Sequence, residues 1–194
     1  MFMRQNLVVR KTKETDISIE LNIDGKGSFE GTSGVGFFDH MLNSFAVHGK
    51  FDIKINVVGD LYVDCHHTVE DIGIVLGNAF KNALGDKKGI SRFGEMTIPM
   101  DEALANAVVD ISGRPFLVFN AEFNKPMVGD FDTDMVIEFF RAFAMNSGMT
   151  LHINLLYGQN AHHCIEAIFK AVAHAIRKAS EIVCSEILST KGSL

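Results

Sequence analysis

Two short stretches carry the same residue types at the same spacing and together could bind metal ions. Residues 66–70 read HHTVE and residues 162–166 read HHCIE. Each histidine pair opens a segment with helical periodicity, so the first histidine and the glutamate, four positions apart, share a helix face. Adjacent helical residues point about 100° apart, which prevents neighbouring histidines from comfortably chelating one ion. We therefore expect each pair to reach toward two different metals.

A further ligand in each half follows from aligning the helices that precede these motifs. The alignment pairs Phe45 with Phe143 and sets His40 opposite Glu138. Imidazole and carboxylate groups both bind metals, and such a mixed set suits manganese, iron or zinc. Cysteine is absent from the repeated positions, which disfavours a structural zinc site. The predicted metal ligands are His40, His66, His67, Glu70, Glu138, His162, His163 and Glu166.

The cysteines and the remaining histidines are also of metal-binding type, but we expect most of them to have structural or surface roles. Cys65 and Cys164 lie beside the histidine pairs, where they are either extra ligands or, as we favour, small buried residues. The three cysteines cannot all pair within one chain and none forms a CxxC, so free thiols in a reducing compartment fit best. His48, His152 and His174 have no histidine counterpart in the other half, and we expect structural or surface roles.

The motifs are positioned by alternating strand-like and helix-like segments. Alternating apolar residues, interrupted by glycines, predict a hairpin over residues 16–31. Helical periodicity predicts helices over 37–49 and 133–148, each ending on a glycine. The same patterns predict a strand over 51–60 and a helix over 66–85, then strands over 92–100, 103–111, 114–123 and 149–158, and a final helix over 162–187.

Both halves thus follow one order of elements: strand, strand, strand, helix, strand, helix. The sequence predicts an α+β fold made by internal duplication of a βββαβα unit, with halves at 1–90 and 91–194. We expect two antiparallel or mixed sheets with helices packed between them or on one face. Because no linker rich in Pro, Gly or Ser separates the halves, they should form one compact domain.

Composition argues against several classes of partner. The 194 residues are 47% hydrophobic and 22% charged, as in globular proteins. A net charge of −6 disfavours nucleic acid as the main partner. No apolar run approaches the roughly 20 residues that span a bilayer, so no membrane partner is expected. The N-terminal segment turns polar too early for a signal peptide, and we expect a cytoplasmic protein.

At these residues the chain resembles the imidazoleglycerol-phosphate dehydratase family of histidine biosynthesis. The resemblance covers nearly the whole chain, and the paired His-His-x-x-Glu motifs are its most specific part. The matching stretches are RKTKETDISIELNIDG, GVGFFDHML, GDLYVDCHHTVEDIGIVLG, SRFGEMTIPMDEALA, DISGRPFLVF, LHINLLYGQNAHHCIEAIFKA and STKG. The resemblance implies conversion of D-erythro-imidazole glycerol phosphate to imidazole acetol phosphate and water, with two Mn2+ ions per active site.

The resemblance also implies a fold, an assembly and roles for residues. The fold is a duplicated unit of the ribosomal protein S5 domain 2-like type, in a homo-oligomer (an octahedral 24-mer) with active sites between subunits. Glu138 departs from the histidine of some family members, and Asn43 and Ser44 depart from an Asp-Gln pair. Glu14 and Asp101 fall on catalytic positions, and the positions that bind the substrate phosphate are Arg92, Arg114, Ser189 and Lys191.

Two other functions are compatible with the same ligand pattern. One is a dinuclear metallohydrolase of a small phosphorylated substrate, and the other is a non-enzymatic shell protein whose assembly is nucleated by metal. The product separates them, because a hydrolase releases inorganic phosphate or an amine while a dehydratase keeps the phosphate and forms a ketone. A shell protein would bind metal and assemble without turnover.

Overall fold

The computed structural model describes residues 4–192 and 194, which contain two four-stranded sheets of matching construction. The strand order is β1-β2-β4-β3 in the first sheet and β5-β6-β10-β7 in the second. In each, three antiparallel strands are extended by a fourth that runs parallel to its neighbour. The first half contains β1 (Gln5–Lys11), β2 (Thr15–Asn22), β3 (Phe29–Glu30), α1 (Gly36–Gly49), β4 (Asp52–Gly59) and α2 (His66–Leu84).

The second half repeats this order and adds a small hairpin before its first helix. The α+β fold predicted from the sequence is confirmed. The elements are β5 (Phe93–Met100), β6 (Ala103–Asp110), β7 (Phe116–Asn120), β8 (Met127–Val128), β9 (Phe131–Asp132), α3 (Met135–Ser147), β10 (Thr150–Tyr157) and α4 (Ala161–Ser180). The added hairpin is β8–β9, which the sequence patterns did not predict.

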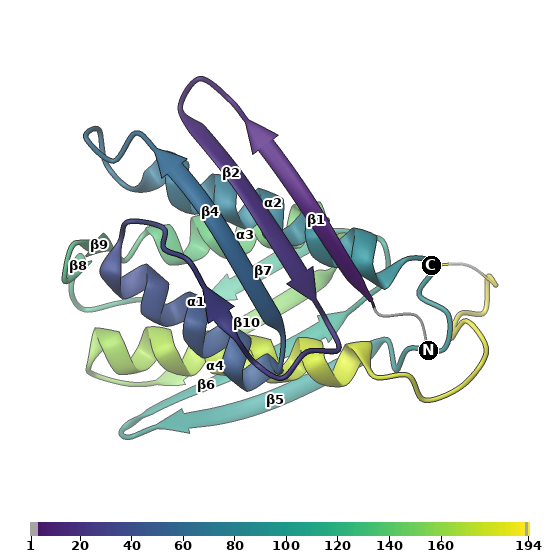
Figure 1. Cartoon of the computed structure of the whole chain (residues 1–194). Helices are drawn as coiled ribbons and strands as arrows, with labels where there is room; N and C mark the ends of the chain where they lie inside the picture. The colour runs from purple at the N-terminus through teal and green to yellow at the C-terminus, as the bar shows by residue number, and fades with distance from the viewer. Residues whose placement is uncertain (1–3, 193) are drawn as a thin grey trace.

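The helices lie between the two sheets (Figure 1). α2 packs against β1 and β2, α4 packs against β5 and β6, and the two layers meet where α2 contacts α3 and α1 contacts α4. Side chains alternate along a strand, so Ile17, Ile19 and Leu21 of β2 all face the helices and are fully buried. Within the described residues no helix is long and apolar enough to cross a membrane.

The predicted hairpin over residues 16–31 is wrong. β2 forms its hairpin with β1, while β3 pairs in parallel with β4, which lies between β2 and β3. The connecting loop is held by Asp52, whose Oδ1 accepts the backbone N–H groups of residues 26–28 at 2.9–3.1 Å. Alternation and glycines mark strands and turns locally, but they do not identify which strand becomes the neighbour.

The final helix is shorter than predicted, because α4 ends at Ser180 rather than at residue 187. Beyond it the chain becomes extended, with Ile182 bridged to Ile90 and the N–H of Val183 donated to the carbonyl of Gly89 at 2.8 Å. Ile182 and Val183 are β-branched and suit extended backbone. Both are largely exposed, so they lie beyond the core that stabilises the helix. The other three helices begin and end within two residues of the prediction.

Candidate metal centre

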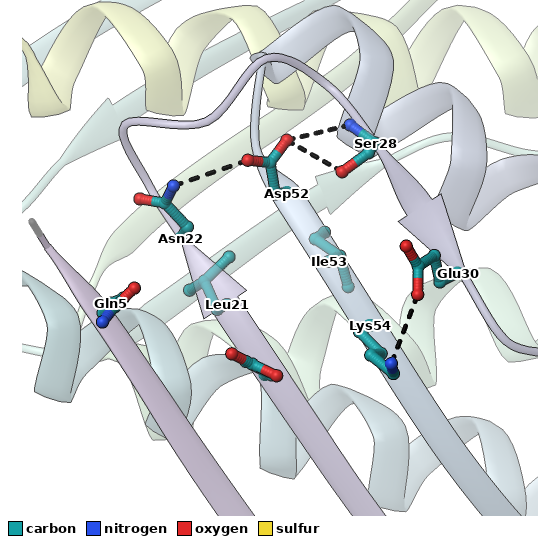
Figure 2. Close-up of a pocket in the computed structure, with 9 residues that line it drawn as sticks. Gln5, Leu21, Asn22, Ser28, Glu30, Asp52, Ile53 and Lys54 are labelled. Atoms are coloured by element: carbon teal, nitrogen blue, oxygen red, sulfur yellow. Dashed lines mark hydrogen bonds and ion pairs between the residues drawn. The ribbon is translucent and has the colours of Figure 1, made fainter.

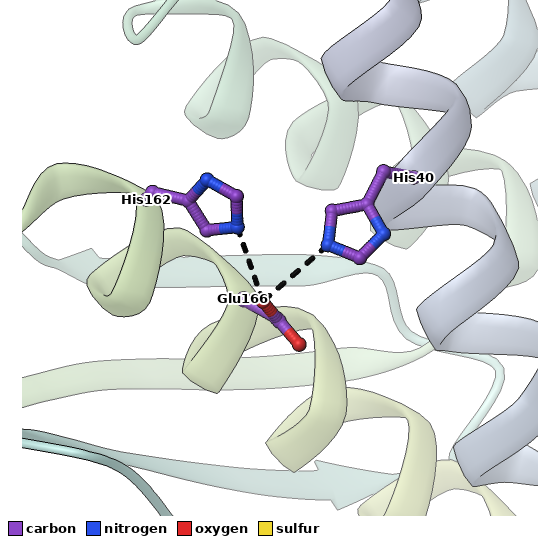
Figure 3. A group of neighbouring side chains, drawn as sticks. All are labelled: His40, His162 and Glu166. Carbon is purple, nitrogen blue, oxygen red and sulfur yellow. Dashed lines mark ion pairs between the residues drawn. The ribbon is translucent and has the colours of Figure 1, made fainter.

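Three of the predicted ligands come together between α1 and α4. Nε2 of His40 lies 3.4 Å from Oε2 of Glu166, and Nε2 of His162 lies 3.2 Å from the same oxygen. Figure 3 shows the two rings reaching this carboxylate from different helices. The ligand atoms all lie within 4.8 Å of one another, which makes this the one candidate metal-binding group among residues 4–192 and 194.

The start of α4 positions two of these side chains. Asn160 caps the helix by accepting the N–H of His162 at 3.0 Å, and Glu166 follows one turn later on the same face. Glu166 is only 8% exposed, and its Oε1 accepts a hydrogen bond from Nζ of Lys170 at 2.7 Å. Burial works to raise the pKa of Glu166, but the hydrogen bond and charge of Lys170, with His40, lower it overall. The group is therefore held as a carboxylate with Oε2 toward the histidines.

The two histidines of each motif are turned differently, and the second has a partner of its own. The ring planes of adjacent histidines differ by 70° in the first motif and by 77° in the second. Nδ1 of His67 lies 3.0 Å from Oδ2 of Asp60, and Nδ1 of His163 lies 2.7 Å from Oε2 of Glu102. That neighbouring histidines do not share one ion stays a prediction from helix geometry.

These contacts polarise both imidazole rings. The hydrogen bond to Asp60 raises the pKa of His67, and the hydrogen bond to Glu102 raises the pKa of His163. Conversely, the pKa of Glu102 falls to about 2, chiefly through His163 and then through the backbone N–H of Asn160. Each second histidine is thus paired with a carboxylate on its Nδ1 side.

The two predicted catalytic carboxylates lie on the other side of the same rings. Oε1 of Glu14 is 3.9 Å from Nε2 of His67, and Oδ2 of Asp101 is 3.7 Å from Nε2 of His163. Glu14 comes from the turn between β1 and β2, and Asp101 comes from the turn between β5 and β6. The two hairpin turns therefore present an acidic group to the same ring nitrogen in both halves.

Between α2 and α3, the counterpart of the three-residue group is not assembled among the described residues. Among the described residues, His66, Glu70 and Glu138 form no group with metal-binding spacing. Both carboxylate oxygens of Glu138 bond instead to NH1 of Arg141, one turn further along α3. That these three residues bind metal stays a prediction.

The predicted phosphate-binding residues gather at the far end of α4. Arg92 binds Asp110 through Nε at 2.7 Å and the carbonyl of Leu188 through NH1 at 2.8 Å. Arg114 lies 3.8 Å from the same aspartate, and its side chain is 67% exposed. Leu188 immediately precedes residues 189–191, which contain the predicted Ser189 and Lys191. The hydrogen bond from Arg92 to Leu188 thereby keeps the C-terminal segment close to Arg92 and, through the shared Asp110, to Arg114.

Some residues around the site were not predicted. Lys170 stands four positions after Glu166, so its i,i+4 spacing was a visible signal. Asp60 and Glu102 approach the histidines from other elements, and no spacing within the motif reveals them. Cys65 is half-buried and Cys164 is buried, and neither joins the candidate metal-binding group.

A hollow on the solvent side of the first sheet is separate from this site. Figure 2 shows its lining, with Asp52 bonded to Asn22 and Ser28, and with Lys54 paired to Glu30 at 3.3 Å. None of the predicted site residues lines it. Asn22, Ser28, Asp52, Lys54 and Glu30 in its lining are paired with one another, and Asp52 fastens the loop that precedes β3.

Fold and site together define a duplicated α+β protein whose histidines and carboxylates gather at the first turns of two helices. The family model for imidazoleglycerol-phosphate dehydratase matches residues 33–176. The dehydratase of Clostridioides difficile (strain 630) is 59% identical over 192 residues, covering 99% of this chain and 100% of the relative, and that of Methanosarcina mazei is 55% identical over 192 residues with the same coverage. The chain belongs to the imidazoleglycerol-phosphate dehydratase family, a family of lyases in histidine biosynthesis.

Solved structures agree in fold as well as in sequence. The crystal structure of imidazoleglycerol-phosphate dehydratase from Staphylococcus aureus superposes with a TM-score of 0.82 at 45% identity, covering 92% of this chain and 100% of that one. The enzyme from Pyrococcus furiosus, in complex with (S)-C348, gives a TM-score of 0.83 at 37% identity, covering 96% and 100%.

Proposed function

We propose that this chain dehydrates D-erythro-imidazole glycerol phosphate to imidazole acetol phosphate, using two Mn2+ ions per active site. The observation that carries the proposal is the group of His40, His162 and Glu166, whose ligand atoms lie within 4.8 Å of one another. It stands in a chain of the dehydratase family. The spacing and the mixture of imidazole and carboxylate fit a divalent ion of the manganese, iron or zinc type.

The side chains that would hold the ions are those of the repeated motifs together with His40 and Glu138. When bound, the ions would supply Lewis-acid stabilisation of negative charge on the substrate ring as the hydroxyl group leaves. The proton lost from the carbon beside the ring needs an acceptor. Glu14 is suited to that task because it faces His67 across 3.9 Å from an exposed turn. Asp101 faces His163 in the same manner and is the second candidate.

The phosphate of the substrate would bind at Arg92 and Arg114 with Ser189 and Lys191. Arginine presents a planar fork that matches phosphate oxygens, and lysine adds a mobile charge. In this chain both arginines face Asp110, and the C-terminal segment is already fastened to Arg92. An exposed Arg114 leaves donors free for an anion.

These two parts of the site lie too far apart to act on one small molecule within one chain. The backbone N–H of Arg92 bonds to the carbonyl of Ala179 in the last turn of α4, whereas His162 lies in the first turn. At 1.5 Å per residue, the helix between these residues is about 26 Å long. We therefore propose that the phosphate-binding residues of one chain complete the metal site of another. This requires a homo-oligomer, for which the family resemblance implies an octahedral 24-mer.

The decisive experiment is incubation of the manganese-loaded protein with imidazole glycerol phosphate, with detection of both the ketone product and inorganic phosphate. Ketone without phosphate release supports the dehydratase. Phosphate release would support a metallohydrolase instead. Absence of any product at every manganese loading would contradict the enzymatic proposal and leave a metal-nucleated shell protein. Glu14→Gln should lower turnover strongly while manganese remains bound, and full turnover would remove Glu14 from the mechanism.

Sharing of the site between chains is tested by complementation. Chains carrying His162→Ala and chains carrying Arg114→Ala should each be inactive alone. Coexpressed in equal amounts, they should recover up to about a quarter of wild-type activity, because random assembly gives intact pairs at that frequency. No recovery, in mixed particles confirmed by mass spectrometry, would contradict a site shared between chains.

A further inference from the structure

The Nδ1 atoms of His67 and His163 face carboxylates that the repeat does not relate to each other. Asp60 stands directly after β4, and the corresponding residue after β10 is Gly158. Glu102 stands directly before β6, and the corresponding residue before β2 is Glu14, which faces the other ring nitrogen of His67. The two halves thus reach the same arrangement, a carboxylate on Nδ1, from different elements.

Glu102 is held rigidly in this arrangement. Its Oε1 accepts the backbone N–H groups of Gln159 and Asn160 at 3.2 and 2.7 Å, and its Oε2 lies 2.7 Å from Nδ1 of His163. These two residues immediately precede α4, so one carboxylate fixes both the approach to the helix and the ring at its start. The acceptor positions are occupied on both oxygens, which leaves one orientation for the side chain.

Asp60 is held less completely. Its Oδ2 lies 3.0 Å from Nδ1 of His67, but its Oδ1 is buried without a hydrogen-bond partner among the described residues. The side chain is 11% exposed. The contact with His67 therefore supplies the one hydrogen bond that the Asp60 carboxylate makes in the described part of the chain.

A carboxylate on Nδ1 decides which nitrogen can bind a metal. A neutral imidazole carries its proton on one nitrogen and a lone pair on the other. A carboxylate that accepts a hydrogen bond from Nδ1–H keeps the proton there and leaves the lone pair on Nε2. In metal sites such a partner also fixes the plane of the ring. Nε2 of His67 and Nε2 of His163 are the nitrogens that face Glu14 and Asp101, on the side where the proposed reaction takes place.

We propose that Asp60 and Glu102 are positioning residues that fix the Nδ1–H tautomer and the ring orientation of His67 and His163, so that Nε2 of each ring is the metal-binding atom. The proposal rests on the metal-dependent function proposed above. Glu102 contributes more than Asp60, because the backbone of residues 159–160 locks its orientation.

The sharpest variant is Glu102→Gln. The glutamine carbonyl can replace Oε1 in accepting the two backbone N–H groups, which turns the NH2 group toward Nδ1 of His163. An NH2 donor there requires a lone pair on Nδ1 and so moves the ring proton to Nε2. We expect E102Q to fold like the wild type, yet to lose about 10- to 100-fold in Mn2+ affinity, the range found when such partners of metal-binding histidines are removed. A merely structural role for Glu102 would instead be rescued by glutamine.

Two measurements read this effect separately. Isothermal titration with Mn2+ gives the affinity, and magic-angle-spinning NMR of 15N-histidine protein without metal gives the tautomer of His163. E102Q should move the His163 signal from the Nδ1–H to the Nε2–H form, and Asp60→Asn should do the same to His67 more weakly, because asparagine can rotate its carbonyl toward the ring. Asp130→Ala, which removes an exposed carboxylate from the β8–β9 turn, is the charge-matched control and should change neither reading.

E102Q that binds Mn2+ within about twofold of the wild type, or that keeps the Nδ1–H signal, would overturn the proposal. If glutamine impairs folding, Glu102→Ala with a thermal unfolding curve serves the same test, and an unchanged affinity in that variant also overturns it. Failure of the proposed function is distinguishable, because wild-type protein would then show no Mn2+ binding or no turnover.

Discussion

The helix pairs α1–α4 and α3–α2 each join one helix from each half and are related by the repeat, but among the described residues only α1–α4 assembles a candidate metal-binding group. In α1–α4, one oxygen of Glu166 is held by Lys170 and the other faces two histidines. In α3–α2, Glu138 gives both oxygens to Arg141. The difference follows from two positions: Lys170 is replaced by Ile74 in the repeat, and Arg141 is replaced by Asn43. A repeat can thus conserve the ligand types while the neighbouring cations decide which ligands are available.

The two helix pairs also differ in how closely they approach. A Cβ added at Gly77 of α2 would lie 2.7 Å from the carbonyl oxygen of Phe143 on α3, and one added at Gly73 would lie 2.7 Å from that of Phe139. The equivalent positions on α4 carry side chains, Phe169 and Ala173. The backbones of α2 and α3 therefore lie close together, and this interface leaves no room for a larger side chain at Gly73 or Gly77.

The largest effect should come from removing the carboxylate of the assembled group. Glu166→Ala should weaken the tightest Mn2+ binding by on the order of 100-fold, whereas Glu70→Ala should weaken it by about 10-fold, since Glu70 belongs to the α3–α2 group that is not assembled. Titration of Mn2+ followed by EPR of the free ion measures both. Glu166→Gln, which keeps a hydrogen-bond acceptor for Lys170, controls for the buried lysine. Equal losses in the two alanine variants would show that the halves are equivalent when metal binds.

The next effect concerns the close packing of α2 on α3. Gly77→Ala should lower the free energy of unfolding by about 1–3 kcal/mol, because the new methyl group collides with backbone atoms that cannot rotate away. The melting temperature should fall by roughly 2–4 °C per kcal/mol for a chain of this size. Gly36→Ala at the start of α1 is the matched control, because its Cβ would meet nothing within 4 Å. A stabilised G77A would mean that the helices separate without cost.

Some of these features could be predicted from the sequence and others could not. Periodicity located the helices and placed the histidine pairs at the starts of α2 and α4, because those patterns are local. Alignment of the halves listed His40 as a ligand without indicating which motif it joins, and the structure places it beside Glu166 of the second motif. The prediction failed for the 16–31 hairpin, where β4 inserts between the strands. Such pairings depend on the whole sheet.

The carboxylates around the histidines lay outside sequence reasoning for a different reason. Alignment of the halves finds equivalent residues, but Asp60 and Glu102 come from non-equivalent elements. Likewise, Arg141 follows Glu138 and Lys170 follows Glu166 at similar helical spacings. These spacings do not reveal that Glu138 gives both oxygens to its cation while Glu166 keeps one toward the histidines. Neighbours in space decide whether a side chain is free to bind a metal ion, and residue spacing along the chain predicts only some of those neighbours.

A smaller effect is expected from freeing Glu138, whose carboxylate is bound to Arg141. Arg141→Met removes the partner of Glu138 and should raise the affinity of the weaker class of Mn2+ sites by about 2- to 5-fold, the equivalent of one surface ion pair. Lys81→Met on α2 is a control with the same loss of charge, and it should leave the affinity unchanged. If R141M binds no better than K81M, then Arg141 does not limit metal binding between α3 and α2.

The smallest effect concerns a position where each helix interface contains a pair of polar side chains, histidines in one and asparagines in the other. Nδ1 of His48 lies 3.3 Å from Nε2 of His174 between α1 and α4, and the equivalent residues Asn146 and Asn78 are bonded at 3.3 Å between α3 and α2. Burial lowers the pKa of His48, helped by Lys170 and the His174 ring and opposed by Glu166, and burial lowers the pKa of His174, helped by Lys50.

Because these histidines bind protons less readily in the folded chain than in the unfolded one, stability should be complete above about pH 6.5 and should fall as the pH drops below it. The double variant His48→Asn, His174→Asn copies the other interface and should flatten this dependence. We expect the melting temperature of the wild type to drop by up to about 4 °C more than that of the variant between pH 7 and pH 5.5, with both melted in chelator. Parallel curves would mean that the histidine pair binds protons equally well in the folded and the unfolded chain, and that the two interfaces differ in residue type without differing in response to protons.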